Sequence, residues 1–504
     1  MAKDSVTTTS FISPNSVTRD IVAKLWNLCH ILRDDGITYN EYVTELTYLL
    51  FLKMLAETGR ENRLPDAYRW SELDSREGLE QLEFYKQLLL DLGNQKQVVD
   101  PVVLSIFTDA QTRLRKPTNL KALTDAIDRL DWFSAREEGL GNLYEGLLEK
   151  NAAEKKSGAG QYFTPRPLID CIVRLVKPQA GEMIQDPAAG TGGFLVAADQ
   201  YIKQHTNDLY TLTKEQAHFQ RHEAYRGLEL VPDAHRLCLM NLILHGIESS
   251  VLCGDSLSPD GEALGKADVI LTNPPFGTKK GGGRPTRSDF STTAETSNKQ
   301  LAFVEHIYRA LNPGGRAAIV LPDNVLFEDN TGRKLRQQLM ELCGLHTILR
   351  LPTGIFYAQG VKTNVLFLTR GKTDRGNTKN VWVYDLRANM NSFGKTRLLT
   401  VADFAPFEAA FGDDRLGQSP RTDLGEEGRF RCFTREQIAA RNDNLDIAWL
   451  RDTSNDPEDE LTEPEEIAAA IATHLRNALA EIEMLSQELD SEDKGQVLPE
   501  IIER

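Results

Sequence analysis

The chain has 504 residues, of which 40% are hydrophobic, 26% charged and 8% aromatic, and its formal net charge is −16. This composition excludes collagen-like, fully disordered and disulfide-scaffold proteins. At roughly 150 residues per domain the length predicts about three units, or one large domain with extensions. The six cysteines form no CxxC pair, which argues against a zinc ribbon, a thioredoxin motif and a disulfide framework. No apolar run approaches the ~18 residues of a membrane span, and the first residues lack a signal-peptide core. We therefore expect a cytoplasmic protein with no membrane partner.

The negative charge is concentrated near the C-terminal end. Residues 455–504 carry 15 acidic and 3 basic side chains, so the preceding residues share a net charge of only −4. The body of the protein can therefore still present basic surface to a nucleic acid. A basic stretch at 279–299 is either a solvated loop or such a surface; its bases are Lys279, Lys280, Arg284, Arg287 and Lys299.

The first part of the chain has helical periodicity. Between about 17 and 155 apolar residues recur at helical spacing, as in Val22, Leu25, Trp26 and Cys29. We therefore expect an all-helical N-terminal domain over 1–153. The polar, glycine-rich segment EKKSGAG at 154–160 indicates the linker into the next domain.

Short apolar runs that end in turn residues alternate with helical segments between 160 and 390. The runs are EMIQDPAAG, YRGLEL, SVLCGD, ADVILTNPP, GRAAIVLPD, HTILRLP and TNVLFLTR. Strands that alternate with helices predict an α/β fold with a doubly wound, mainly parallel sheet that is covered on both faces. We assign this second domain to 154–390.

The remaining sequence has two parts. Residues 391–460 are a mixed extension, rich in Asp, Gly and Arg, whose structure the pattern does not define. The acidic tail at 461–504 contains one apolar stripe at helical spacing after Pro464. The stripe predicts a C-terminal helix that either docks on its own domain or binds a partner subunit; its residues are Ile467, Ile471, Leu475, Leu479, Ile482, Leu485 and Leu489.

The first strand of the predicted sheet leads into the turn DPAAGTGGFL at 186–195. In open α/β sheets ligands bind at the carboxyl ends of the strands, and Gly190, Gly192 and Gly193 would let a ligand approach the backbone and the next helix N-terminus. The turn does not match GxGxxG and lacks the GK[ST] of a phosphate-binding loop, so an ATP-driven motor is not supported. Alone, this turn does not identify a particular nucleotide.

Two acidic residues end the next strands. Glu229, in GLEL, is placed to accept hydrogen bonds from ribose hydroxyls, with the polar stretch 203–222 as an insertion before it. Asp255, in CGDSL, is placed to accept a hydrogen bond from the exocyclic amine of an adenine ring. The structural alternatives are a surface glutamate and a helix N-cap aspartate.

The sequence NPPF at 273–276 follows the apolar run that begins at Asp268. Two consecutive prolines fix the backbone, so the Asn273 side-chain oxygen and the Pro274 carbonyl can point at one spot. Two acceptors that hold an NH2 group direct its protons and leave the nitrogen lone pair available to attack an electrophile. Phe276 would supply a flat face for a stacked base. A stiff loop with a buried phenylalanine is the alternative for NPPF alone.

The order of these motifs resembles a known family. DPAAGTGGF, an acid after the second strand, GD and then NPPF resemble the S-adenosylmethionine-dependent amino-methyltransferases that modify adenine N6 in DNA. GQYFTP at 160–165, upstream of the glycine-rich turn, is similar to the motif that marks the gamma order in that family. Within the family the chain is most similar to the modification subunit of type I restriction-modification enzymes, through runs such as KSGAGQYFTPRPL and HTILRLPTGIFYAQGVKTNVLF.

The resemblance implies a cofactor, a set of site residues and no metal. The cofactor is S-adenosylmethionine, and the catalytic residues are Asn273, Pro274, Pro275 and Phe276, which orient the adenine amine for direct attack on the sulfonium methyl group. The cofactor-binding residues it implies are Gln161, Tyr162, Phe163, Thr164, Asp186, Ala188, Gly190, Thr191, Gly192, Gly193, Glu229 and Asp255.

The resemblance also implies partners. They are DNA, a specificity subunit that reads a split target, a second copy of this chain in an assembly of two modification subunits and one specificity subunit, and in some systems a restriction subunit. The target adenine leaves the duplex to reach the site. Phe276 stacks on it, Phe356 is the candidate for a second ring with core packing as its alternative, and the DNA-contact loop contains Lys279, Lys280, Arg284 and Arg287.

Several other chemistries are excluded or less well supported. Cytosine C5 methylation needs a cysteine nucleophile, usually after proline, and none of the six cysteines follows a proline. A zinc deaminase would need PCxxC with a histidine, and a dehydrogenase would need GxGxxG. Two alternatives remain: an amino-methyltransferase that acts on RNA or on protein glutamine, and a catalytically silent assembly subunit.

Overall fold

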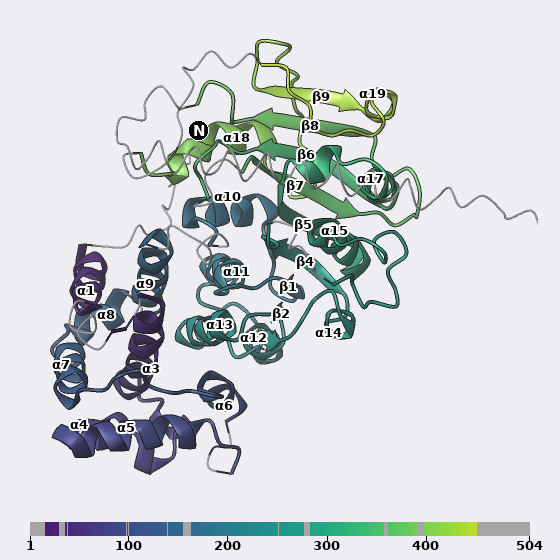
Figure 1. The fold of residues 1–504 in the computed structure, drawn as a ribbon. Helices are drawn as coiled ribbons and strands as arrows, with labels where there is room; N and C mark the ends of the chain where they lie inside the picture. The colour runs from purple at the N-terminus through teal and green to yellow at the C-terminus, as the bar shows by residue number, and fades with distance from the viewer. Residues whose placement is uncertain are drawn as a thin grey trace, which may run out of the picture.

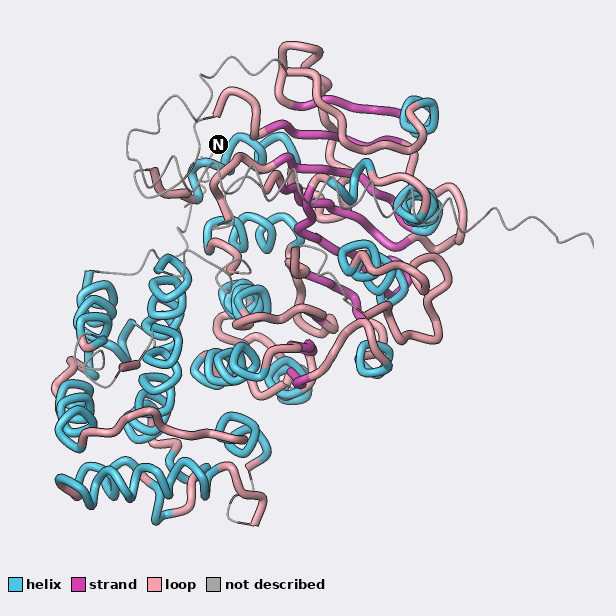
Figure 2. The backbone as a smooth tube through the Cα atoms, viewed as in Figure 1, coloured by secondary structure: helices cyan, strands magenta, loops and turns pink. Residues whose placement is uncertain are grey.

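The computed structural model describes residues 16–29, 36–37, 39–96, 98, 100–138, 140–154, 163–249, 251–276, 283–356, 361–390, 393 and 397–450. The predicted C-terminal helix and most of the predicted linker lie outside these residues. Figure 1 shows a helical domain beside an α/β domain, and Figure 2 shows that the strands belong to the second of these. Among the described helices, none combines the length and apolar character that crossing a bilayer requires.

Every regular element in the described part of the N-terminal domain is a helix, as the periodicity predicts. The helices pack around α3 (Tyr39–Glu57), whose side chains between Tyr42 and Leu55 are almost all buried. A helix that is apolar on every side needs neighbours on every side. Helices α4 (Trp70–Asp74), α7 (Pro117–Asp128), α9 (Leu140–Glu154) and η1 (Glu61–Arg63) contact α3 directly. The other elements of the domain are α1 (Ser16–Asn27), η2 (Asp66–Tyr68), α5 (Gly78–Leu92), α6 (Pro101–Phe107) and α8 (Trp132–Glu138).

The second domain is built on one sheet of nine strands in the order β3-β2-β1-β4-β5-β7-β6-β8-β9. The pairs from β3 to β5 and the pair β6/β8 are parallel, whereas β7 is antiparallel to both of its neighbours and β9 to β8. The mainly parallel sheet is therefore confirmed. The strands are β1 (Ile184–Asp186), β2 (Tyr225–Glu229), β3 (Val251–Cys253), β4 (Ala267–Thr272), β5 (Leu311–Pro322), β6 (Cys343–Arg350), β7 (Thr363–Arg370), β8 (Asn380–Asp385) and β9 (Phe430–Thr434).

Helices cover both faces of this sheet, as a doubly wound fold requires. In β4, Val269 and Leu271 join the core that contains α10 (Arg166–Val176), α11 (Gly193–His205) and α13 (Pro232–Leu244). Ile270, between them, joins a second core with α15 (Lys299–Ala310) and α17 (Thr331–Leu342). The alternation follows from the two-residue period of a strand. The remaining helices are α12 (Lys214–His222), α14 (Pro259–Ala263), α16 (Asn324–Phe327), η4 (Val401–Phe404), α18 (Ala405–Phe411) and α19 (Arg435–Ala440).

The extension at 391–460 is not separate from the α/β domain. Its strand β9 pairs with β8, and Phe404, Phe407 and Phe411 are buried in the core on one face of the sheet. Ile438 and Leu445 are buried in the core on the other face. The expected boundary at 390 is therefore wrong for the described residues, because this segment completes the sheet and both of its cores.

Helix α13 joins the two domains. It packs against α3, α6 and α9 on one side and against β2 and β3 on the other. From this helix Arg236 donates through Nε to the Ile106 carbonyl at 2.6 Å and through Nη2 to the Thr108 carbonyl at 3.0 Å, and its guanidinium lies over the ring of Tyr48. One hydrophobic core runs from the helical domain through α13 into the sheet.

Candidate active site

Strands β1 and β4 are parallel neighbours, with Ile184 opposite Val269 and Gln185 opposite Ile270. Both strands end at the same edge of the sheet. The glycine-rich turn (186–193) after β1 therefore lies beside the NPPF turn (273–276) after β4. Sequence alone places each motif at a strand end, and the strand order brings the two together.

The glycine-rich turn has the backbone that its glycines permit. Gly190 has φ of 54° and Gly192 has φ of 82°, in the left-handed region that other residues rarely adopt. Gly192 precedes α11, so the helix N-terminus faces this edge of the sheet. A side chain at Gly192 would meet the Cys238 sulfur at 3.0 Å, and the Thr191 carbonyl accepts a hydrogen bond from Asn241 Nδ2 at 3.0 Å. Both supporting residues come from α13.

Asp186 begins this turn and is buried. Its Oδ1 accepts a hydrogen bond from the Ala188 N–H at 3.0 Å. Burial raises the pKa of Asp186 to about 7, because a charged carboxylate loses its hydration in the interior. The carboxyl group thus fixes the shape of the turn and contributes less charge than a solvent-exposed aspartate would.

Glu229 ends β2 next to the same turn. Its Oε2 accepts from the Gly190 N–H at 2.8 Å, and its Oε1 accepts from the Val231 N–H at 2.8 Å. The side chain is only partly exposed, and burial raises the pKa of Glu229. The carboxylate is thereby held in one orientation at the carboxyl end of β2.

Asp255 follows β3 and does not cap a helix. Its Oδ1 accepts from the Leu257 N–H at 2.9 Å, and the N-cap of α14 is Ser258, whose side chain accepts from the Asp260 N–H. The N-cap alternative for Asp255 is therefore wrong. The carboxylate lies half-exposed in a tight turn beside Glu229, since the β2/β3 pairing places Glu229 opposite Cys253.

The NPPF turn contains a buried polar atom without a hydrogen-bond partner in the part of the chain that the structure describes. Asn273 is buried, and its Nδ2 donates to Thr164 Oγ1 at 2.9 Å. Among the described residues no donor reaches Asn273 Oδ1, although this atom is buried. A buried acceptor without a donor is costly, so a ligand that donated a hydrogen bond to it would be favoured at this position. The predicted motif GQYFTP thus meets NPPF through Thr164, while Gln161 and Tyr162 lie outside the described residues.

Two aromatic rings meet next to this turn. Phe276 is partly exposed and Phe356 is buried, and their ring centroids lie 5.6 Å apart at an interplanar angle of 84°. The edge-to-face contact brings together the two rings that were predicted to hold the target base. Phe356 also belongs to the hydrophobic core, so in this structure it has the core-packing role that was its alternative.

The basic residues after NPPF differ from the expectation. Lys279 and Lys280 lie outside the described residues. Arg284 is exposed and forms an ion pair with Glu295. Arg287, by contrast, is buried and forms a bidentate ion pair with Asp289, so its predicted contact with DNA is wrong for this structure. A basic residue is buried when a carboxylate and further acceptors surround it.

Three residues near the site were not predicted. Ser256 and His306 surround Arg287, and Asn241 supports the glycine-rich turn. The one available sequence signal was Asn241, a polar residue within the apolar run CLMNLIL of a predicted helix. Ser256 and His306 have no local signal, because their contacts join distant parts of the chain.

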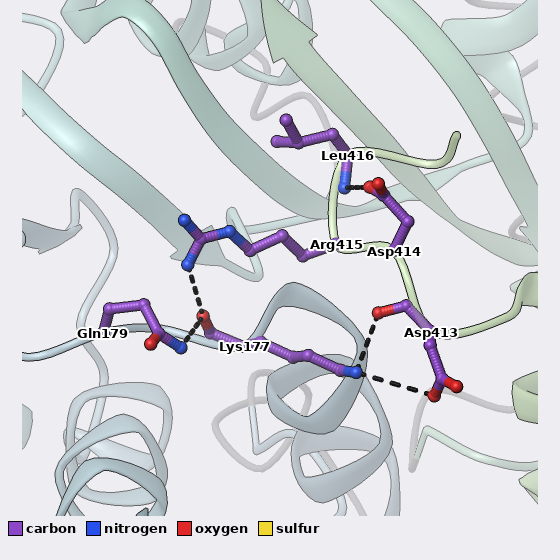
Figure 3. A pocket seen from close by; sticks show the side chains of 6 residues that line it. All are labelled: Lys177, Gln179, Asp413, Asp414, Arg415 and Leu416. Carbon is purple, nitrogen blue, oxygen red and sulfur yellow. Dashed lines mark hydrogen bonds and ion pairs between the residues drawn. The ribbon is translucent and has the colours of Figure 1, made fainter. Parts of the chain in front are cut away.

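A hollow of about 400 Å³ lies elsewhere on the molecule, and Figure 3 shows the six residues that line it. Lys177 Nζ donates to the Asp413 carbonyl at 2.8 Å, and Arg415 lies 3.8 Å from Glu182. Glu182 precedes β1, so the hollow lies at the amino edge of the sheet. It is therefore distinct from the site at the carboxyl edge.

Comparison with protein families agrees with this arrangement. Residues 135–459 match the N-6 DNA Methylase family, and residues 21–127 match the HsdM N-terminal domain. The first match covers the sheet and both turns. The chain belongs to the N-6 DNA methylase family and, within it, to the methylase subunits of type I restriction enzymes.

Individual relatives support the narrower assignment. The EcoKI methylase subunit of Escherichia coli K12 is 48% identical over 96% of this chain and 98% of its own length, and the EcoEI subunit of E. coli is 32% identical over 87% and 92%. The crystal structure of the EcoKI M protein matches 93% of this chain and 96% of its own, with 45% identity and a TM-score of 0.56. A second structure, from a study of assembly and conformational transition in a type I restriction-modification system, matches 95% of this chain and 99% of its own, with 27% identity and a TM-score of 0.69.

Proposed function

We propose that this chain transfers a methyl group from S-adenosylmethionine to the N6 amine of an adenine in DNA. The observation that carries the proposal is Asn273, whose Nδ2 is fixed by Thr164 while its buried Oδ1 has no donor among the described residues. An amine hydrogen of the substrate would satisfy that oxygen. In this structure the amide nitrogen of Asn273 faces Thr164 and its oxygen faces the site, so the side chain presents an acceptor to the substrate.

The residues beside Asn273 fit S-adenosylmethionine. Gly190 and Gly192 expose backbone at positive φ, and a Cβ at Gly190 would find its nearest neighbour 4.0 Å away, which leaves room for a ligand against the turn. Glu229 is an oriented acceptor for ribose hydroxyls, and Asp255 lies at the next strand end. The bound cofactor would supply an electrophilic methyl group. The residues that would hold it are Phe163, Thr164, Asp186, Ala188, Gly190, Thr191, Gly192, Gly193, Glu229 and Asp255, with Gln161 and Tyr162 from the adjoining segment.

The chain's own part in the reaction is orientation. Asn273 Oδ1 and the Pro274 carbonyl accept the two amine hydrogens, so the nitrogen lone pair faces the glycine-rich turn. Pro274 and Pro275 hold the backbone in this geometry, because a proline ring fixes φ. A reacting group held in line avoids most of the entropy cost of the encounter. This arrangement needs no covalent enzyme intermediate.

The target base enters beside Phe276. An adenine must leave the duplex for its amine to reach Asn273 in the interior. The partly exposed ring of Phe276 offers one face to the base, and Phe356 supports that ring edge-on at 5.6 Å. Stacking on an aromatic side chain contributes about 1–3 kcal/mol per base.

We further propose that the chain acts with partners. Two of the similar solved structures come from type I restriction-modification enzymes, and one of these two comes from a study of complex assembly. This chain carries a net charge of −16, so a specificity subunit would bring most of the charge that neutralises phosphates. The proposed assembly contains two copies of this chain and one specificity subunit on DNA, with a restriction subunit as a further partner.

The test is modification-sensitive sequencing of DNA from the native host. Asn273→Ala is expected to remove N6-methyladenine from one two-part motif, while the purified variant still binds S-adenosylmethionine. Asn312→Ala is the matched control, because Asn312 donates to Asp268 at the opposite end of β4 and should leave the methylation map unchanged. A DNA methylation map that Asn273→Ala leaves unchanged would refute the proposal and would favour RNA or protein glutamine as the substrate.

A further inference from the structure

The side chain of Arg287 makes four polar contacts inside the protein. Its Nε and Nη2 donate to the two carboxylate oxygens of Asp289 at 2.7 and 2.8 Å. Its Nη1 donates to the Ser256 carbonyl at 3.2 Å and lies 3.0 Å from His306 Nδ1. We call these four residues the Arg287 bridge. Arg287 therefore joins the segment after the NPPF turn to the β3–α14 turn and to α15.

The β3–α14 turn also contacts the glycine-rich turn. Ser256 Oγ donates to the Pro187 carbonyl, so one residue accepts from Arg287 through its carbonyl and donates to the glycine-rich turn through its side chain. The next residue, Leu257, accepts at its carbonyl from the Thr286 N–H at 2.9 Å. Polar contacts thus run without a gap from Pro187 to Asp289.

Apolar packing follows the same path. Leu257, Phe290 and Phe303 form a small buried core, and Ala188 of the glycine-rich turn packs against it. The Arg287 guanidinium lies 4.8 Å from the centre of the Phe290 ring. The segment after the NPPF turn is therefore one wall of the same core that supports the glycine-rich turn.

His306 fixes the charge state of the bridge. An arginine side chain only donates hydrogen bonds, so His306 Nδ1 must be the acceptor and the ring must be neutral. Burial lowers the pKa of His306 to about 3, with the charge of Arg287 as a further cause, which agrees with a neutral ring. The one positive charge of Arg287 is then balanced by Asp289.

We propose that Arg287 is a positioning residue for methyl transfer, which holds the segment after the NPPF turn against the glycine-rich turn. The inference rests on the proposed function, because that function makes these two turns the sites of the target amine and the cofactor. The polar contacts of Arg287 are with Asp289, Ser256 and His306, and not with a residue of either turn. It acts through Ser256 and the Leu257 core on the turn that would bind S-adenosylmethionine.

The test uses the full-length chain and two readouts that do not depend on turnover. Arg287→Met is expected to raise the dissociation constant of S-adenosylmethionine about tenfold, since contact networks between sites carry effects of this order. Amide hydrogen exchange without cofactor should rise in 186–193 and 255–257. Arg287→Lys should recover part of the affinity, because lysine restores the ion pair with Asp289 but not its bidentate geometry.

Arg316→Met is the matched control. Arg316 is as buried as Arg287, since 4% of each side chain is exposed. Arg316 also pairs with a carboxylate, that of Glu182, and donates to backbone carbonyls, but it lies at the amino edge of the sheet. This variant should lower the stability of the chain and leave the cofactor dissociation constant unchanged. An equal loss of affinity in Arg316→Met would overturn the proposal, because the effect would then be general destabilisation.

Two further outcomes are decisive. A wild-type dissociation constant and exchange pattern in folded Arg287→Met would overturn the inference alone. If Arg287→Met does not fold, Ser256→Ala takes its place, because this change removes only the donor to the Pro187 carbonyl. A severalfold weaker affinity of Ser256→Ala for S-adenosylmethionine supports the role of the Arg287 bridge, and an unchanged affinity refutes it. A wild-type chain that binds no S-adenosylmethionine would instead overturn the proposed function.

Discussion

Gly190 and Gly192 both lie at positive φ, but only Gly192 is packed against another side chain. A Cβ at Gly192 would meet the Cys238 sulfur at 3.0 Å and Leu242 Cδ2 at 3.6 Å, whereas a Cβ at Gly190 would meet nothing closer than 4.0 Å. Left-handed backbone costs a non-glycine residue about 1–2 kcal/mol, and overpacking a buried contact costs about 1–3 kcal/mol more. We therefore expect Gly190→Ala to lower the free energy of unfolding by about 1–2 kcal/mol and Gly192→Ala by about 2–5 kcal/mol.

A double-mutant cycle separates these two costs. Cys238→Ala removes the sulfur that the new methyl group would meet, so in the Gly192→Ala background it should recover about 1–2 kcal/mol relative to additivity. In the Gly190→Ala background the two changes should be additive. The assay is chemical denaturation of the wild type, the three single variants and the two double variants. Equal costs at the two glycines, or additivity in both backgrounds, would show that the contact with Cys238 does not constrain the turn.

Three other predictions follow from single side chains. Burial lowers the pKa of His306 to about 3 in the folded chain, against ~6.5 in the unfolded chain, so the free energy of unfolding falls as the pH drops below ~6.5. Between pH ~7 and pH ~5 the wild type should lose about 2 kcal/mol more of this free energy than His306→Gln does, as measured by urea denaturation. Arg236→Met leaves the Ile106 and Thr108 carbonyls without their donor and should cost about 2–3 kcal/mol in thermal unfolding, whereas a cost near zero would contradict that anchoring role. Phe276→Ala should raise the KM for DNA about tenfold or more and Phe276→Trp should not, and equal constants in steady-state assays would remove stacking from its role.

The sequence was sufficient for the local parts of the site. The glycine-rich turn, the acids at the ends of β2 and β3, and NPPF all lie at strand ends, because strand periodicity and turn residues are local signals. The contact between Thr164 and Asn273, which are 109 positions apart, has no local signal. It depends on strand order, which periodicity does not determine.

Arg287 shows why charge pattern alone misplaced a side chain. A run of bases in a glycine-rich stretch predicts an exposed surface, and Arg284 is indeed exposed. Arg287 is buried because Asp289 lies two residues further on and because Ser256 and His306 approach from other elements. The same limit applies to 391–460, whose strand β9 is defined by pairing with β8 rather than by its own sequence.

The hydrophobic core that passes through α13 bears on how this chain unfolds. The two family matches divide the chain between 127 and 135, yet Leu143 and Tyr144 of α9 belong to one core with Leu50 of α3 and Leu242 of α13. Packing that is shared across a boundary makes the two sides melt together. The unit that folds is thus larger than either family match, and a calorimetric scan should show one transition for the helical and α/β parts.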